Sequence, residues 1–393
     1  MVNSRFLHAA DLHLGAPLQS LGDSVPADVA AGIRQRVNRV FDNLVQVAIR
    51  EQVAFVVLAG DVYDTAERDP GARRRVMLGL RQLDDAGIPV FMVHGNHDPL
   101  TSQFVAGAAL PPNVTVFGAG GVESRVVTMP NGVPVTVAGI SYATAAETNN
   151  LSEQFSGVVG STVVGVLHTN VGGNSQHGNY APCSAADLET SPVHYWALGH
   201  VHDRQVHATP KGFWAYPGNL QGRSAKATEC GAKGVLLVDV HADGGLGQPL
   251  FQACDVVRFQ RLAVDLSQVG ELDSVHDHVI ASLQQAVDAA EDRSLMVRLS
   301  LCGATGINAE LGKNWQSVRA AIVEEAADVL TDGGVVKVIN SCRPAIDLVA
   351  ERAKDTLLGS VLNELDLLEQ PDLDPALRLE VERLLVDALD GAR

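Results

Sequence analysis

The chain has 393 residues, 46% of them hydrophobic, which is enough for more than one buried core and excludes an intrinsically disordered protein. Its formal net charge is −17, and residues 261–393 carry 24 acidic against 12 basic side chains. An acidic protein repels a phosphate backbone at long range, so a nucleic-acid substrate requires local positive charge or bound metal.

The chain lacks the apolar stretches that would take it to a membrane. The first ten residues do not resemble a signal peptide, and no uncharged run reaches the roughly 18 residues that a spanning helix needs. We therefore expect a cytoplasmic location and no membrane partner. The five cysteines are scattered, with no close pair, which predicts reduced thiols rather than a zinc site or a disulfide framework.

The first hundred residues alternate between strand and helix patterns. The predicted elements are a strand over 5–10, a helix over 28–51, and a strand over 53–59, followed by a helix over 72–86 and a strand over 88–93. The strand at 53–59 is a continuous apolar run, which is typical of a strand covered on both faces. This alternation predicts an α/β layered fold whose site lies along one edge of a sheet.

Shorter strands follow, separated by turn residues. They are predicted over 114–117, 122–128, 133–140, 161–167, 195–198 and 233–240. Asn131-Gly132 is a hairpin turn between two of them. From residue 257 a smaller α+β pattern begins, and after residue 343 the pattern is helical, ending with a helix over 376–389. We predict three parts: 1–256, a capping domain over 257–343, and a helical segment over 344–393.

Metal-binding side chains follow the predicted strands. Each cluster alone is more often a solvated loop or a turn than a ligand set. Together they supply the mixed oxygen and nitrogen donors that a pair of divalent metals needs: Asp11, His13, Asp61, Asn96, His168, His200 and His202. Two metals about 4 Å apart polarise a phosphoryl oxygen and activate water. Their joint occurrence therefore predicts a two-metal hydrolase site.

These clusters, in this order, resemble the calcineurin-like metallophosphoesterase superfamily, through the motif around Asp11 and His13, the Gly60-Asp61 pair, Gly95-Asn96-His97-Asp98, and Gly199-His200-Val201-His202. The resemblance implies a layered β-sandwich flanked by helices. It also implies that Asp11, His13, Asp61 and His202 hold one metal, and that Asp61, Asn96, His168 and His200 hold the other. His97 would act above the metals on the leaving oxygen, with Asp98 orienting its imidazole.

A narrower resemblance is to the SbcD-type DNA repair nucleases, and within them to the YhaO-like branch. It rests on the stretches 7–15, 167–170, 180–183 and 216–219. In that family the second domain caps the site, and C-terminal helices bind an SMC-like ATPase of the SbcC type. One departure concerns Asp64, because some of these nucleases carry a histidine at that position.

Several candidates allow two interpretations. His177 in a glycine-rich loop is a substrate contact or a solvated histidine. Arg73-Arg74-Arg75, the basic triplet of the chain, is a solvated helix face or a phosphate contact. The apolar spacing over 28–86 suits a homodimer interface, as the family resemblance suggests, and equally a core-facing helix.

The favoured hypothesis is a metal-dependent phosphodiesterase that acts on DNA ends, as exonuclease or endonuclease, with an ATPase partner. Manganese is the favoured ion, with iron or zinc as alternatives, because such mixed shells accept all three. Two other hypotheses stay open: a phosphodiesterase for a small nucleotide, and a catalytically silent scaffold for the ATPase.

Overall fold

The computed structural model describes residues 4–16, 18, 21, 25–64, 69–102, 110–173, 178–368, 374, 380 and 383. The chain forms two compact units. The first contains Met1–Leu262, Val279–Ser300 and Ala320–Ile339; the second contains Ala263–His278, Leu301–Arg319 and Asn340–Arg393. Because both units draw on residues 257–343, the domain boundaries expected from the sequence stay predictions.

The first unit contains a six-stranded sheet in the order β12-β11-β1-β2-β3-β4. Its strands are β1 (Arg5–Ala9), β2 (Val56–Ala59), β3 (Val90–Val93), β4 (Val114–Val116), β11 (Gly234–Asp239) and β12 (Leu250–Ala253). The strands β1 to β4 are parallel, whereas β11 is antiparallel to β1. The carboxyl ends of β1, β2 and β3 therefore meet at one edge of this sheet.

A second six-stranded sheet has the order β5-β6-β7-β8-β10-β9. Its strands are β5 (Glu123–Thr128), β6 (Pro134–Ile140), β7 (Thr162–His168), β8 (Tyr195–Gly199), β9 (Gln205–Thr209) and β10 (Gly212–Tyr216). The predicted hairpin joins β5 to β6 and turns at Gly132, whose φ is +87°. The strands β6, β7, β8 and β10 are parallel, so histidines at the ends of β7 and β8 share an edge.

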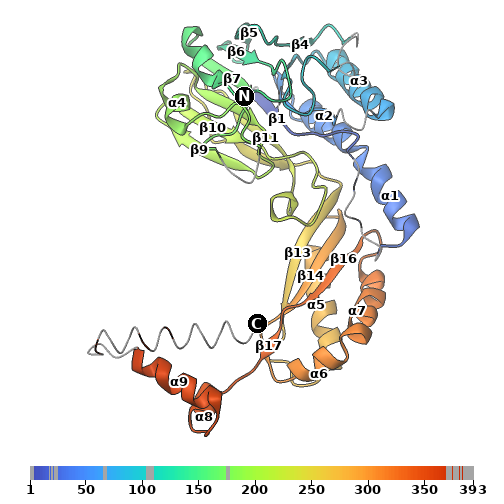
Figure 1. Ribbon diagram of the computed structural model, residues 1–393. Helices are drawn as coiled ribbons and strands as arrows, with labels where there is room; N and C mark the ends of the chain where they lie inside the picture. Colours follow the sequence, from blue (N-terminus) through green and yellow to red (C-terminus); the bar gives the residue numbers. More distant parts are fainter. Residues whose placement is uncertain are drawn as a thin grey trace. The chain divides into compact units, whose positions relative to one another are not determined.

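The two sheets pack face to face, with helices outside them (Figure 1). The core between the sheets consists of apolar residues of both, including the stacked rings of Phe6 and Phe55 and the ring of Tyr195 edge-on to Phe6. The helices α2 (Val40–Arg50) and α3 (Pro70–Asp85) cover the other face of the first sheet. The short helices η1 (Leu151–Gly157) and α4 (Ala185–Thr190) cover the second. The expected layered sandwich flanked by helices is confirmed.

One predicted element is divided in two. The sequence predicts a single helix over 28–51, but the structure has α1 (Ala27–Val37) and then α2, with Asn38 and Arg39 between them. The two helices serve different cores. Ile33 of α1 packs against Phe259 and Met296, whereas α2 packs on the first sheet. A straight helix cannot reach both clusters, and apolar spacing alone does not register the break.

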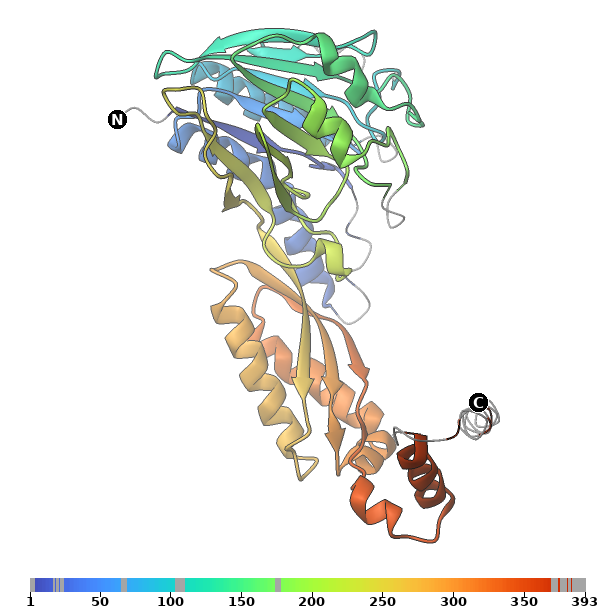
Figure 2. The same cartoon turned by 90° about the vertical axis from the view of Figure 1, so that its left-hand side faces the viewer.

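The remaining elements follow in chain order. They are η2 (Ala227–Glu229), β13 (Val257–Asp265), α5 (Ser274–Asp288), β14 (Ser294–Cys302), β15 (Ala304–Thr305), α6 (Asn308–Lys313), α7 (Trp315–Val329), β16 (Gly334–Asn340), β17 (Arg343–Pro344), α8 (Leu348–Arg352) and α9 (Leu357–Leu368). The strands β13, β14 and β16 form a three-stranded sheet, and α5 and α7 run beside it (Figure 2). The predicted helix over 376–389 lies almost entirely outside the described residues.

Candidate metal centre

The predicted ligands come from loops at the ends of five strands. Asp11 and His13 follow β1, Asp61 follows β2, and Asn96 follows β3; His168 ends β7, and His200 and His202 follow β8. Four of these residues have a left-handed backbone: φ is 51° at Asp11, 43° at His13, 51° at Asp61 and 107° at His200. Such conformations cost roughly 1–3 kcal/mol each and persist only where surrounding structure enforces them. Their clustering marks this edge of the sandwich as a functional site.

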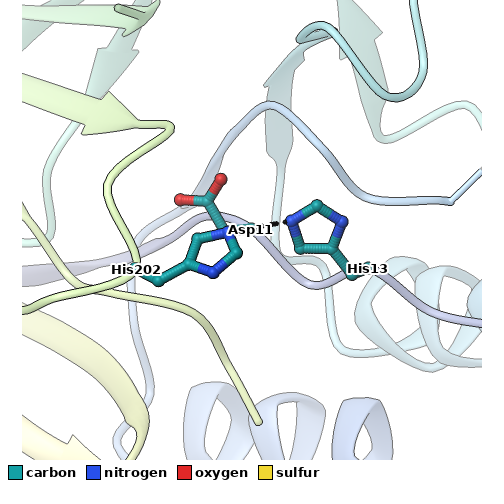
Figure 3. Close-up of side chains that lie close together, drawn as sticks. All are labelled: Asp11, His13 and His202. Carbon is teal, nitrogen blue, oxygen red and sulfur yellow. Dashed lines mark hydrogen bonds between the residues drawn. The ribbon is translucent and has the colours of Figure 1, made fainter. Parts of the chain in front are cut away.

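One group of ligand atoms joins Asp11, His13 and His202, with all three atoms within 4.8 Å of one another (Figure 3). The two Nε2 atoms of His13 and His202 lie 3.1 Å apart. Asp11 is fully buried, and its carboxylate accepts the N–H of His200 at 2.9 and 3.0 Å. Two ring nitrogens and one carboxylate therefore face one point.

A second group gathers around Asp61. One of its carboxylate oxygens, Oδ2, lies 3.8 Å from Nε2 of His13 and 3.4 Å from Nε2 of His168. Asn96 Oδ1 lies 3.1 Å from His168 Nε2 and 3.3 Å from His200 Nδ1. Asp61 therefore lies between the two groups of ligands, which is the position that a bridging carboxylate needs.

The buried charges of this centre shift one another's pKa. Burial raises the pKa of the Asp11 carboxyl to about 6 and holds the pKa of His13 well below its usual value. Burial also acts to lower the pKa of His168, but the charge of Asp61 and its hydrogen bond outweigh this and raise that pKa to about 9. Burial acts to raise the pKa of Asp61, and the charge of His168 reverses the shift. A proton shared between Asp61 and His168 occupies a place that suits a cation.

The donor set fits divalent metals. His202 donates Nδ1–H to Glu229 at 2.7 Å, so its Nε2 carries the lone pair that points toward His13. The low pKa of His13 keeps that imidazole neutral as well. Imidazole nitrogens with carboxylate and amide oxygens accept manganese, iron or zinc. The residues present can hold two such ions.

The role expected for Asp98 is corrected by the structure. The sequence predicts that Asp98 orients His97, but its buried carboxylate accepts hydrogen bonds from four backbone N–H groups, those of Asp61, Val62, Tyr63 and Gly95, at 2.8–3.3 Å. Asp98 thus ties the loop after β2 to the loop after β3. It positions Asp61 rather than the imidazole that follows Asn96.

Asp64 is the carboxylate that the structure places beside His97. Its Oδ1 lies 3.6 Å from Nδ1 of His97, and this interaction is the main cause that raises the pKa of His97 above its usual value. The His97 side chain is 43% exposed, and its ring lies edge-on to that of His13, with the centroids 4.8 Å apart. His97 therefore lies at the solvent side of the centre, where a substrate arrives.

Glu229 is a residue of the site that the sequence analysis misses. It is 6% exposed and accepts hydrogen bonds from His202 Nδ1, from Asn219 Nδ2 at 2.8 Å and from the backbone N–H of Arg223 at 2.9 Å. Burial acts to raise the pKa of its carboxyl, but the hydrogen bond and charge of His202 hold that pKa well below its usual value. No local motif announces Glu229, because its partners lie up to 27 residues away in sequence.

Two further candidates have different outcomes. His177 lies outside the described residues. Arg73 lies in α3, half-buried, and its charge acts on the pKa of Tyr63 near the loop after β2. The described cysteines are free thiols. Within the described chain, no helix has the length and apolar character required to cross a membrane.

Comparison with known proteins defines the class. The pattern of the family described as calcineurin-like phosphoesterase matches residues 4–204, more than half of the chain. The chain belongs to this family of metal-dependent phosphoester hydrolases, whose members use a dinuclear metal site. A second pattern, described as the middle domain of metallophosphoesterase YhaO, matches residues 259–343.

Particular relatives narrow the branch. The chain is 31% identical over 275 residues to the uncharacterized metallophosphoesterase YhaO of Bacillus subtilis, which covers 70% of this chain and 66% of that protein. It is 26% identical to the DNA double-strand break repair protein Mre11 of Aeropyrum pernix, over 72% of this chain and 68% of that one. A protein of the SbcCD nuclease of Bacillus subtilis is 25% identical over 60% of this chain and 66% of its own. These similarities support a branch of the DNA-repair nuclease type.

Proposed function

We propose that this protein hydrolyses phosphodiester bonds in DNA with two divalent metal ions. The observation that carries the proposal is the position of Asp61, whose carboxylate lies between the ligand groups of His13 and of His168. Relatives named for double-strand break repair support DNA as the substrate. Manganese is the favoured ion, with iron or zinc as alternatives.

Each side chain has a part in this proposal. Asp11, His13, Asp61 and His202 would hold one ion, and Asp61, Asn96, His168 and His200 the other. Bound metals polarise the phosphoryl group and activate water. His97 gives a proton to the leaving oxygen, and Asp64 keeps its imidazole charged. Asp98 fixes the loop that carries Asp61.

The rest of the chain is assigned by the same resemblance. Residues 1–256 would form the nuclease domain, 257–343 a cap that selects the substrate, and 344–393 a helical segment that binds an SMC-like ATPase of the SbcC type. The pattern match at 259–343 supports the middle boundaries. A homodimer and a cytoplasmic location stay predictions.

Digestion of defined DNA ends tests the proposal. Purified protein is incubated with manganese and with single-stranded and double-stranded oligonucleotides that carry blunt, recessed or hairpin ends, with and without its ATPase partner. We expect metal-dependent cleavage that His97→Ala reduces by about 100-fold or more, since general acid catalysis contributes that much. Intact DNA under all of these conditions would overturn the proposal.

A small phosphodiester such as a cyclic or dinucleotide is the second candidate substrate. The net charge of −17 and the acidic Asp64 beside His97 favour it, because both disfavour a long polyanion at the site. Rapid hydrolysis of nucleotides with no cleavage of DNA in the same substrate panel would establish this candidate in place of the first.

A further inference from the structure

A recess opens beside the metal centre and is continuous with it. His13 belongs to both, and the recess extends from there between the loop after β1, the link between α1 and α2, the start of α3, and the segment at 221–223. It holds about 370 Å³ of space, its open mouth included. Its polar lining consists of His13, Asn38, Arg75, Gln221 and Arg223.

The recess is lined by positive charge. Arg75 and Arg223 contribute guanidinium groups, and none of the described residues that line it is acidic. Their side chains are 27% and 25% exposed, so solvent and ligands reach them. The charge of Arg223 also acts to lower the pKa of His13 and His97, so its field extends into the metal centre.

Neighbouring groups hold the two guanidinium groups in place. Arg75 donates from Nη2 to Asn38 Oδ1 at 2.9 Å and to Asp69 Oδ2 at 3.1 Å. Nη2 of Arg223 lies 3.4 Å from Glu229 Oε1. Asp69 and Glu229 do not line the recess. A guanidinium has five N–H donors in a fixed fork, so a group anchored through one nitrogen keeps donors for an anion.

We propose that this arginine recess binds a phosphate of the substrate that neighbours the phosphate being hydrolysed. Arginine recognises phosphate through charge-assisted, often bidentate hydrogen bonds. In a chain of net charge −17, a positive recess next to the metals supplies the local attraction that a polyanionic substrate requires. The inference rests on the proposed phosphodiesterase function and names how that site receives more than one phosphate.

The test compares substrates with and without a neighbouring phosphate. The metal-loaded protein is given bis(p-nitrophenyl) phosphate, an unphosphorylated thymidine dinucleotide, and the same dinucleotide with a phosphate at each end. The variant is Arg75→Gln, because Arg223 also touches Glu229 and so affects a metal ligand. Arg75→Lys restores the charge, and Arg74→Gln, on an exposed residue of the same helix, is the matched control.

We expect Arg75→Gln to raise KM for the phosphorylated dinucleotide by about 10-fold, the loss typical of one hydrogen bond to a charged group, with kcat little changed. The other two substrates are unaffected, Arg75→Lys recovers part of the loss, and Arg74→Gln behaves as wild type. Inorganic phosphate, tested as an inhibitor, distinguishes a recess that takes free phosphate from one that takes only phosphate attached to substrate.

Equal effects of Arg75→Gln on all three substrates, or no effect on any, would overturn the inference. Absence of hydrolysis by the wild type would instead refute the proposed function. In that event calorimetric titration of the phosphorylated dinucleotide into wild type and Arg75→Gln still decides whether the recess binds phosphate: equal affinities reject it. Thermal unfolding of each variant establishes that it is folded.

Discussion

Replacement of Glu229 by glutamine tests how the metal ligand His202 is held. The carboxylate accepts from His202 Nδ1 at 2.7 Å through one oxygen, and from Asn219 Nδ2 and the Arg223 backbone N–H through the other. Glutamine keeps the shape but turns one of these oxygens into a donor. Either the two donors of Asn219 and Arg223 meet an NH₂ group, or His202 loses its acceptor.

The expected magnitude follows from that geometry. Either orientation of the amide removes at least one charge-assisted hydrogen bond, which contributes about 1.5–3 kcal/mol and corresponds to roughly 10–100-fold in affinity. Loss of the carboxylate partner of a ligating histidine typically weakens metal binding by a similar factor. We therefore expect Glu229→Gln to bind the ion at Asp11, His13 and His202 about 10–100-fold more weakly.

Calorimetric titration of metal-free protein with manganese measures this change. Glu189→Gln, an exposed glutamate of α4, is the matched control. Circular dichroism establishes that both variants keep the wild-type secondary structure. Unchanged affinity and stoichiometry in Glu229→Gln would refute the view that this hydrogen bond orients His202 for the metal.

Three further outcomes are expected. Gly95→Ala places a Cβ 2.4 Å from Asp61 Oδ1, so elemental analysis should find less bound metal than in Gly157→Ala, where the added carbon meets nothing within 4 Å. Asp64→Asn removes the main cause that raises the pKa of His97; because an acid must be protonated to act, the fall of kcat with rising pH should move to lower pH. His8 is buried and neutral, held by Tyr195 and Leu198, and burial lowers its pKa to about 3. Only the unfolded state takes up this proton between pH 6.5 and 3, so stability falls with pH, and between pH 7 and 5 urea unfolding of wild type should lose about 2 kcal/mol more than that of His8→Gln.

The sequence by itself determined the ligand inventory and its order, because each ligand follows an apolar run that its own residues mark as a strand. Asp61 after 53–59 and Asn96 after 88–93 are examples, and the observed strands β2 and β3 end just before them. Parallel strands then bring their ends to one edge by geometry. The layered fold was predictable for the same reason.

Only the tertiary structure decided which groups act on one another. The partner of His97 is Asp64 rather than its neighbour Asp98, because the carboxylate of Asp98 turns into the backbone of two loops. Glu229 reaches His202, and the basic triplet contributes Arg75 to a recess beside His13. Side-chain contacts of this kind depend on how loops from separate strands approach each other in space, and no periodicity or spacing in the sequence records that approach.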